Sequence, residues 1–194
     1  MSVPVDDPPL KAALAAAVPI RFDGPAFRVM PGGDAILNAS FEHLWAGSGA
    51  GRCNPAGVSR LHLSVAKKTA QAEFRFYAGR GGIDPDLAES YEFAADVKLA
   101  RVLDLTDGEV RRGLGITRDQ ILADWEPDPL LPPPPPTRLQ SIGYWVSLGF
   151  GNISAILYPS RRRSMGRNIV IFKSRLSPGD SIDPRSKNPT KSWP

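Results

Sequence analysis

The sequence predicts a globular domain of the α+β class, in which helices and strands share one core. Its 194 residues are 42% hydrophobic and 23% charged, which suits a single soluble domain. Residues 66–77 place apolar and small side chains at the i, i+3, i+4, i+7 spacing of one helix face. Two apolar runs, Leu61 to Val65 and Asn168 to Phe172, are typical of strands. We therefore treat residues 1–194 as one domain, with its core over about residues 20–176.

The remaining elements follow from local signals. A proline begins the alanine-rich helix that we expect over residues 8–18. Thr106 and Glu109 have the spacing of a capping box, which predicts a short helix that ends near Gly113. The other expected elements are a helix from Asp34 to about Gly47, strands over residues 91–105 and 155–158, and a helix over residues 138–149.

Two segments have compositions that disfavour helices and sheets. Pro132 to Pro136 predicts an extended polyproline II segment, because successive prolines supply no amide donors. This segment could bind a proline-recognising domain, or it could be a stiff loop over about residues 127–137. The tail over residues 177–194 is rich in Pro, Ser, Asp and Lys and is expected to be irregular.

Composition excludes several classes of protein. Cys53 is the only cysteine, so the chain can form neither an intrachain disulfide nor a cysteine cage for a metal. His43 and His62 are too few for a zinc site, and we expect no metal. No apolar run approaches the roughly 20 residues that span a bilayer, and the acidic, proline-rich start does not resemble a signal peptide. These observations predict a cytoplasmic protein without a membrane segment.

The charge balance indicates the kind of ligand. With 24 basic and 20 acidic residues, the net charge of +4 suits an anionic small molecule or an acidic partner. Nucleic-acid binding stays open as an alternative, although no domain motif for it is present.

Glu73 is the first candidate site residue, because it lies within the core-facing stripe of residues 66–77. A carboxylate in that position must be paired, hydrogen-bonded or open to a cavity, since an unpaired buried charge costs several kcal/mol. Two structural roles are alternatives to a functional one. The side chain could reach solvent at the helix edge, or it could pair with an arginine.

Arginines and a serine near glycine or proline turns supply the other candidates. Arg28 precedes a Pro-Gly-Gly turn, and Arg52 lies between Gly51 and the Cys-Asn-Pro turn. A guanidinium there can grip phosphate oxygens in bidentate fashion, or it can simply be solvated. Ser160 precedes a basic loop, residues 161–167, that could hold an anion, contact an acidic partner or be plain surface. Without a Gly-x-Ser-x-Gly elbow or a suitable base, Ser160 is not expected to be a hydrolase nucleophile.

Taken together, these segments resemble the RES domain family. The motifs that carry the resemblance occur in order over most of residues 20–176. They are AFRV around Arg28, the GRCNPAG turn, RLHLSVAKKTAQAE ending at Glu73, RVLDLTD at 101–107, and ILYPSRRRSMGRNIVIF containing Ser160. Two positions depart from the family pattern, because Cys53 stands where tryptophan is usual and His62 where tyrosine is common.

The resemblance implies an ADP-ribosyltransferase-like fold, with a split, mostly antiparallel sheet, flanking helices and a cleft for NAD+. Such proteins are bacterial toxins that act on NAD+ and are neutralised by an Xre-type antitoxin, so nucleic acid would be contacted only through the antitoxin. Glu73, Arg28 and Ser160 would then be catalytic. The residues expected to bind NAD+ are Arg28, Arg52, Asn54, His62 and Ser160.

In this interpretation Glu73 stabilises the oxocarbenium-like charge that develops when the bond between nicotinamide and ribose breaks. Water or phosphate then attacks. Two alternatives remain open. The same site could transfer ADP-ribose to a macromolecule, or the departures at Cys53 and His62 could mark a degenerate module that only binds NAD or a partner.

Overall fold

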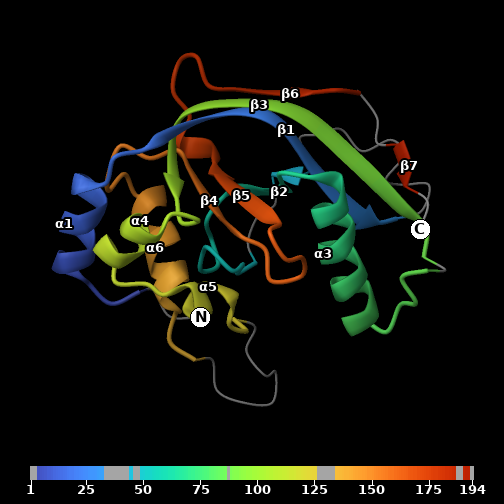
Figure 1. Ribbon diagram of the computed structural model, residues 1–194, viewed down its shortest axis with the longest axis horizontal. Coiled ribbons are helices and arrows are strands. Elements are labelled where there is room, and N and C mark those ends of the chain that lie inside the picture. Colours follow the sequence, from blue (N-terminus) through green and yellow to red (C-terminus); the bar gives the residue numbers. More distant parts are fainter. Residues whose placement is uncertain are drawn as a thin grey trace.

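A computed structural model of the protein describes residues 4–32, 44–45, 49–86, 88–125, 134–186 and 190–192. Helices and strands are interspersed along the chain, which confirms the mixed α+β class (Figure 1). The elements are α1 (Pro8–Ala16), β1 (Ile20–Pro31), β2 (Arg60–Ser64), α3 (Lys67–Arg80), β3 (Ser90–Asp104), α4 (Gly108–Gly113), α5 (Arg118–Leu122), α6 (Arg138–Ser147), β4 (Ala155–Pro159), β5 (Arg167–Phe172), the 3-10 turn η2 (Lys173–Arg175), β6 (Ser181–Pro184) and β7 (Thr190–Ser192).

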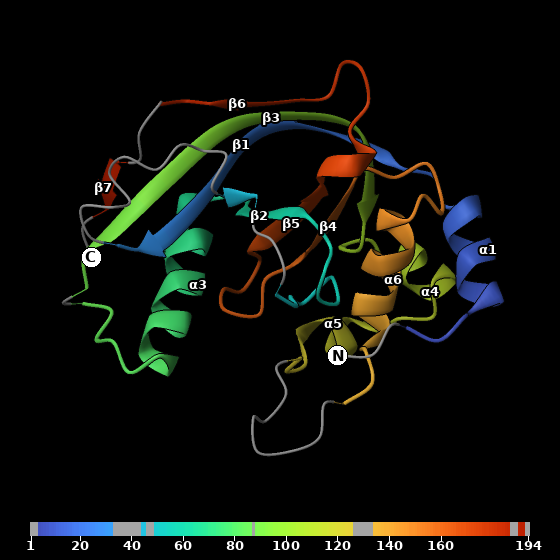
Figure 2. The same ribbon diagram turned by 180° about the vertical axis from the view of Figure 1, so that it is seen from behind.

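The strands join in one mostly antiparallel sheet, in the order β1-β2-β5-β4-β3-β6, with β7 added to β3. β1 and β3 form a long antiparallel ribbon that arches over β2, β4 and β5 (Figures 1 and 2). Among the described strands, only β3 and β4 pair in parallel. β1 also pairs with β2, but at the single position Phe27 and Ser64. The two strands are therefore free to separate on either side of that contact.

Alternate side chains of β4 and β5 enter two different apolar clusters, because successive residues of a strand point to opposite faces. One cluster lies against α1 and α6, and the other lies beneath the β1–β3 ribbon. This double burial explains the continuous apolar sequences of both strands. A third, smaller cluster packs α3 against β1 through Val29, Ala70, Phe74 and Ala78.

The stripe predicted on α3 is confirmed except at its C-terminal end. Thr69, Ala70 and Phe74 are buried, whereas Tyr77 is 42% exposed and Ala78 takes the inward place. An α-helix has 3.6 residues per turn, so a face that passes through Phe74 can continue at either the third or the fourth following residue. Packing against β1 selects the small alanine.

The cap predicted for the short helix α4 is wrong by one residue. Asp107, not Thr106, accepts hydrogen bonds from the first amides of the helix, at Glu109 and Val110. The hydroxyl of Thr106 instead donates to Asp104 Oδ1 at 2.6 Å. The next helix, α5, was not predicted, although it begins with a complete capping box at Thr117 and Gln120.

The tail is not irregular throughout, contrary to its composition. β6 and β7 both pair antiparallel with β3, within residues that the composition predicts to be unstructured. Composition reports how little apolar surface a segment can bury. It does not report that the outer edge of β3 offers unpaired backbone groups, which short polar strands can satisfy.

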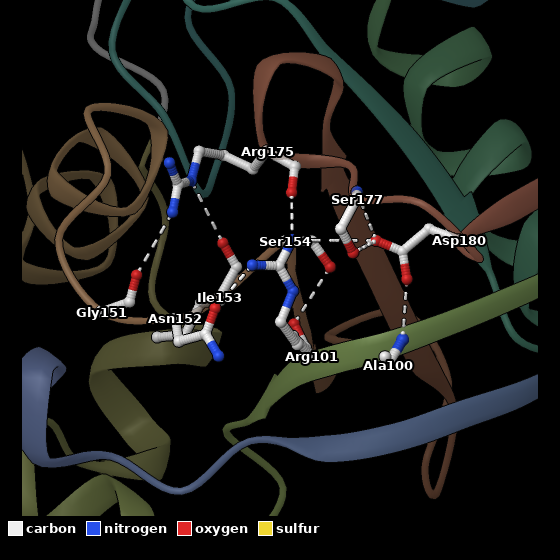
Figure 3. Close-up of polar contacts among 9 residues, drawn as sticks. All are labelled: Ala100, Arg101, Gly151, Asn152, Ile153, Ser154, Arg175, Ser177 and Asp180. Carbon is white, nitrogen blue, oxygen red and sulfur yellow. Dashed lines mark hydrogen bonds and ion pairs between the residues drawn. The ribbon is translucent and has the colours of Figure 1, made fainter.

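A polar cluster fixes the chain where it returns toward β3 (Figure 3). Asp180 accepts hydrogen bonds from the Ala100 amide and from both the amide and the hydroxyl of Ser177, each at 2.9 Å. Arg101 Nη2 donates to the carbonyl of Arg175 at 2.6 Å. Buried charged groups need such partners, so this cluster has a structural explanation.

Two predicted segments fall largely outside the described residues. A helix was expected from Asp34 to about Gly47. Of these residues the structure describes only Leu44 and Trp45, so both expected ends lie outside the described residues. Of the five successive prolines, Pro134 to Pro136 are described, and they belong to no helix or strand.

Helix α6 packs directly against the backbone of Cys53, and this close contact requires a glycine at position 143 of the helix. A Cβ atom built at Gly143 would lie 1.6 Å from the carbonyl oxygen of Cys53, so the helix or the turn must move. We expect Gly143→Ala to lower the free energy of unfolding by about 1–3 kcal/mol or more, measured by urea denaturation. Gly79→Ala is the matched control, because a Cβ there meets nothing within 4 Å and alanine favours a helix. Equal effects of the two substitutions would contradict this explanation.

Candidate active site

A cavity of about 360 Å³ lies between α3, the second half of β1, β2 and the turn at Gly51. Its walls are largely apolar and aromatic, with contributions from Phe27, Phe74 and Trp125. The charged side chains that line it are those of Arg28, Arg52, Arg60 and Glu73. Three cations and one carboxylate therefore share a partly enclosed space, which suits an anionic ligand with an apolar or aromatic part.

Strand register places a row of polar side chains on the sheet face beside this cavity. Ser64 of β2 is paired with Asn168 of β5, which is in turn paired with Tyr158 of β4. All three side chains are at least 94% buried, with exposed fractions of 5%, 6% and 4%. The apolar neighbours on the same strands point to the opposite face. The row is thus a polar interruption of a buried surface, and its groups must satisfy one another.

Glu73 on α3 reaches this row. Its Oε1 accepts hydrogen bonds from Ser160 Oγ and from Asn168 Nδ2, both at 2.7 Å. Ser64 Oγ donates to Asn168 Oδ1 at 2.8 Å, so the amide of Asn168 must turn its NH₂ group toward the carboxylate. Within the described part of the chain, Glu73 forms no ion pair with an arginine. The structural pairing considered from the sequence is not observed there.

The second carboxylate oxygen of Glu73 has a different environment. Oε2 has no hydrogen-bond partner among the described residues, and Glu73 is a lining residue of the cavity. One oxygen therefore fixes the position of the side chain, and the other remains available to a ligand. The Ser160 hydroxyl also accepts from the Arg162 amide at 3.1 Å, which orients its proton toward Glu73.

Arg28 extends from β1 into the same cavity. Its Nη1 donates to the carbonyl of His62 at 3.3 Å, and it forms no ion pair with any described residue. Burial, together with the neighbouring charge of Arg60, lowers the pKa of the Arg28 guanidinium. A partly buried cation with like-charged neighbours gains most from an anionic ligand.

Arg52 is fastened to a different element. Its Nη1 donates to the carbonyls of Ile121 and Ala123, at 2.8 and 2.7 Å, where α5 ends. Arg52 also lines the cavity, and its Nε and Nη2 have no partners among the described residues. The solvated surface arginine considered from the sequence is therefore not what the structure shows.

Asn54 lies behind the cavity rather than on its wall. The side chain is fully buried, and its Nδ2 donates to the carbonyl of Pro55 at 2.6 Å. The backbone of Asn54 pairs with that of Gly51, which forms the tight turn. Gln140 Nε2 of α6 binds the carbonyl of Gly51 at 3.0 Å and anchors this turn. A direct contact of Asn54 with a ligand stays a prediction.

His62 is held as a neutral ring. Burial, and then the charges of Arg60 and Arg28, keep its pKa well below the ordinary value of 6.5. Two contacts of His62 Nε2 involve atoms of opposite kinds: Arg60 Nε, which can only donate, lies 3.3 Å away, and Asn54 Oδ1, which can only accept, lies 3.4 Å away. Nδ1 faces Tyr158 Oη at 3.4 Å, and a hydroxyl can donate or accept, so these contacts are compatible with either tautomer of the neutral ring. His62 therefore has no positive charge with which to repel a cationic ligand group.

Cys53 is buried beneath this site and is not reactive. Burial raises the pKa of its thiol to about 12, although the nearby charge of Arg52 and a hydrogen bond with Tyr158 act in the opposite direction. The thiol is therefore protonated at neutral pH and serves as a small apolar group.

Arg60 and Asn168 are among the contributors that were missed in the sequence. Arg60 precedes His62 by two residues, so strand alternation places both side chains on the cavity face. Asn168 was taken only as the start of a buried strand. The pairing of β2 with β5, which no local pattern reveals, brings it next to Glu73.

Within the described ranges, no group of three or more His, Cys, Asp or Glu residues could hold a metal ion. None of the helices described there is long and apolar enough to cross a membrane.

The neutral state of His62 predicts how stability depends on pH. Below about pH 6.5 the unfolded chain takes up a proton at this residue while the folded protein does not, so acid favours unfolding. We expect the free energy of unfolding to fall by up to about 1.4 kcal/mol per pH unit between about pH 6 and 5 from this group alone. Urea denaturation of the native protein and of His62→Gln checks this. The variant should show a flatter dependence, and parallel curves would contradict the assignment.

Comparisons with known proteins agree with the motifs. The RES domain profile matches residues 25–191, which is most of the chain. The fold is similar to a chain in the crystal structure of the M. tuberculosis MbcT-MbcA toxin-antitoxin complex, with a TM-score of 0.71 and 20% sequence identity over 96% of this chain and 93% of that one. No curated protein sequence matches significantly. The profile match shows that this chain belongs to the RES domain family.

Proposed function

We propose that this protein is the toxin of a bacterial toxin-antitoxin pair and that it cleaves the nicotinamide-ribose bond of NAD+. The observation that carries the proposal is the environment of Glu73. Ser160 and Asn168 hold one carboxylate oxygen, the other has no partner among the described residues, and Glu73 lines a cavity that Arg28 and Arg52 also line. A fixed carboxylate facing unpaired guanidinium groups matches a substrate that carries both a cationic ring and a diphosphate.

The proposed reaction needs little besides charge placement. When the glycosidic bond breaks, its electron pair leaves with the nicotinamide ring, which becomes neutral and needs no acid catalyst. The positive charge moves to the ribose, where Glu73 stabilises it. Water then adds to the anomeric carbon and releases a proton to solvent, or phosphate adds instead. Arg28 and Arg52 bind the diphosphate, and His62 and Ser160 position the ribose.

The proposal includes an ADP-ribosyltransferase-like split of the sheet, and the pairing of β1 with β2 supports it. Strands β1 and β2 are joined only at Phe27 and Ser64, whereas β2 and β5 are paired at five positions. The weak connection leaves β1 and β2 able to diverge as the two halves of a split sheet would. The cavity lies between residues 28–31 of β1 and residues 62–64 of β2.

The proposed partner is an acidic antitoxin of the Xre type, which would meet the toxin in the cytoplasm and connect it to nucleic acid only indirectly. The similar fold in the MbcT-MbcA complex supports a protein partner. Exposed arginines offer it a positive surface: Arg161 and Arg163 in the loop after β4, and Arg167 at the start of β5.

The decisive experiment replaces Glu73. We expect Glu73→Gln to lower the rate of nicotinamide release from NAD+ about a hundredfold or more, because the amide keeps the shape but lacks the charge. Its urea midpoint should stay near that of the native protein. Glu109→Gln is the matched control, since Glu109 lies on α4 and is 77% exposed, and it should retain full activity.

The products identify the acceptor. NAD+ labelled in its ADP-ribose part should yield free ADP-ribose with water, or ADP-ribose 1-phosphate when phosphate is present. Label found on a macromolecule of a cell extract would instead indicate a transferase. An undiminished rate in Glu73→Gln, or no NAD+ consumption by the native protein, would overturn the proposal.

A further inference from the structure

Trp125 lines the cavity from a segment that no strand or helix contains. It follows Asp124, three residues beyond the end of α5. The residue is partly buried and lines the same cavity as Arg28, Arg52 and Glu73. A large aromatic residue that lines this cavity, and that belongs to none of the apolar clusters of described residues, is available to contact a ligand.

The segment that carries Trp125 is fastened from two sides. Arg52 binds the carbonyls of Ile121 and Ala123 with both N–H groups of Nη1. Arg161 forms an ion pair with Asp124, and Arg162 lies 4.0 Å from the same carboxylate. These contacts link the segment to the Gly51 turn and to the loop that begins at Ser160.

A third contact connects the same loop to the helix that carries Glu73. The guanidinium carbon of Arg162 lies 3.0 Å from the centre of the Phe76 ring on α3. The loop after β4 is thus held to α3 on one side and to the α5 segment on the other. The backbone next to Trp125 is therefore fixed by the same two loops that carry Arg52 and Ser160.

We propose that Trp125 is a stacking platform for a planar base of a nucleotide ligand, and that Arg52 is the positioning residue that holds this platform. The indole offers a flat π surface on which adenine or nicotinamide can stack, and stacking needs no particular hydrogen-bond pattern. The cations beside it neutralise the phosphates of the same ligand. This inference takes the identity of the ligand, NAD+, from the proposed function. It does not depend on the proposed reaction.

The test measures binding rather than turnover. In the full-length Glu73→Gln protein, calorimetric titrations would give the Kd for NAD+, for ADP-ribose, which lacks nicotinamide, and for nicotinamide mononucleotide, which lacks adenine. We expect Trp125→Ala to raise the Kd for NAD+ about tenfold or more and Trp125→Phe to stay within about threefold. The mononucleotide and ADP-ribose show which of the two bases stacks, since only the one carrying that base is weakened.

A matched control comes from another tryptophan. Trp45 does not line the cavity and lies against Lys173, so Trp45→Ala should leave the Kd within about twofold. Arg52→Met keeps an extended apolar side chain but removes the contacts with the α5 carbonyls. Because Arg52 holds Trp125, its substitution should weaken binding less in the Trp125→Ala background than in the Trp125 background.

The outcomes separate this inference from the proposed function. If Trp125→Ala binds NAD+ as tightly as its parent, the platform is overturned even though the native protein cleaves NAD+. If the losses from Arg52→Met and Trp125→Ala simply multiply, the positioning role of Arg52 is overturned. If NAD+ binding depends on Trp125 but the native protein releases no nicotinamide, the platform stands and the proposed reaction falls.

Discussion

Two hydrogen bonds to a single oxygen of Glu73 connect helix α3 to the sheet, and the geometry of the site depends on them. They come from Ser160 after β4 and from Asn168 on β5. Ser64 on β2 donates to the carbonyl oxygen of Asn168, which orients the NH₂ group of Asn168 toward Glu73. Three strands and a helix therefore meet at one carboxylate. The two hydrogen bonds fix the rotamer of Glu73, because Oε1 cannot move without breaking a buried network. They therefore also fix the direction of Oε2.

The cations around the cavity impose a second constraint. Arg28 and Arg52 line it without a carboxylate partner in the described part of the chain, and they lie close enough to lower the pKa of His62. Such a concentration of like charge destabilises the folded protein unless an anion binds. The fold tolerates it because carbonyl groups accept from both arginines, and this leaves their charge unneutralised and available to a ligand.

The positions of the two departures from the family pattern explain why they are compatible with the fold. Cys53 lies beneath the tight turn, where Gly143 brings the backbone of α6 into contact with its carbonyl. A small side chain suits such a close approach. His62 retains hydrogen-bonding atoms toward Tyr158 and Arg60. Like the tyrosine that is common at this position in the family, it is an aromatic residue with polar atoms.

The sequence by itself determined the strands and helices with strong local periodicity, together with the ordered motifs that led to Arg28, Glu73 and Ser160. Local patterns also indicated that Glu73 faces inward, because helical spacing is a property of neighbouring residues. Local patterns could not show β6 and β7, whose stability comes from the edge of β3 rather than from their own composition.

Only the tertiary structure decided the partners of each site residue. That Asn168 and Ser160 bind Glu73, that Arg52 holds the end of α5, and that Arg60 joins the cavity all depend on strand pairing and loop packing between residues up to 95 positions apart. Hydrogen bonds act over about 3 Å, so they are set by which elements pack together. Residue types fix what chemistry is possible, and the pairing of distant strands fixes which groups can perform it.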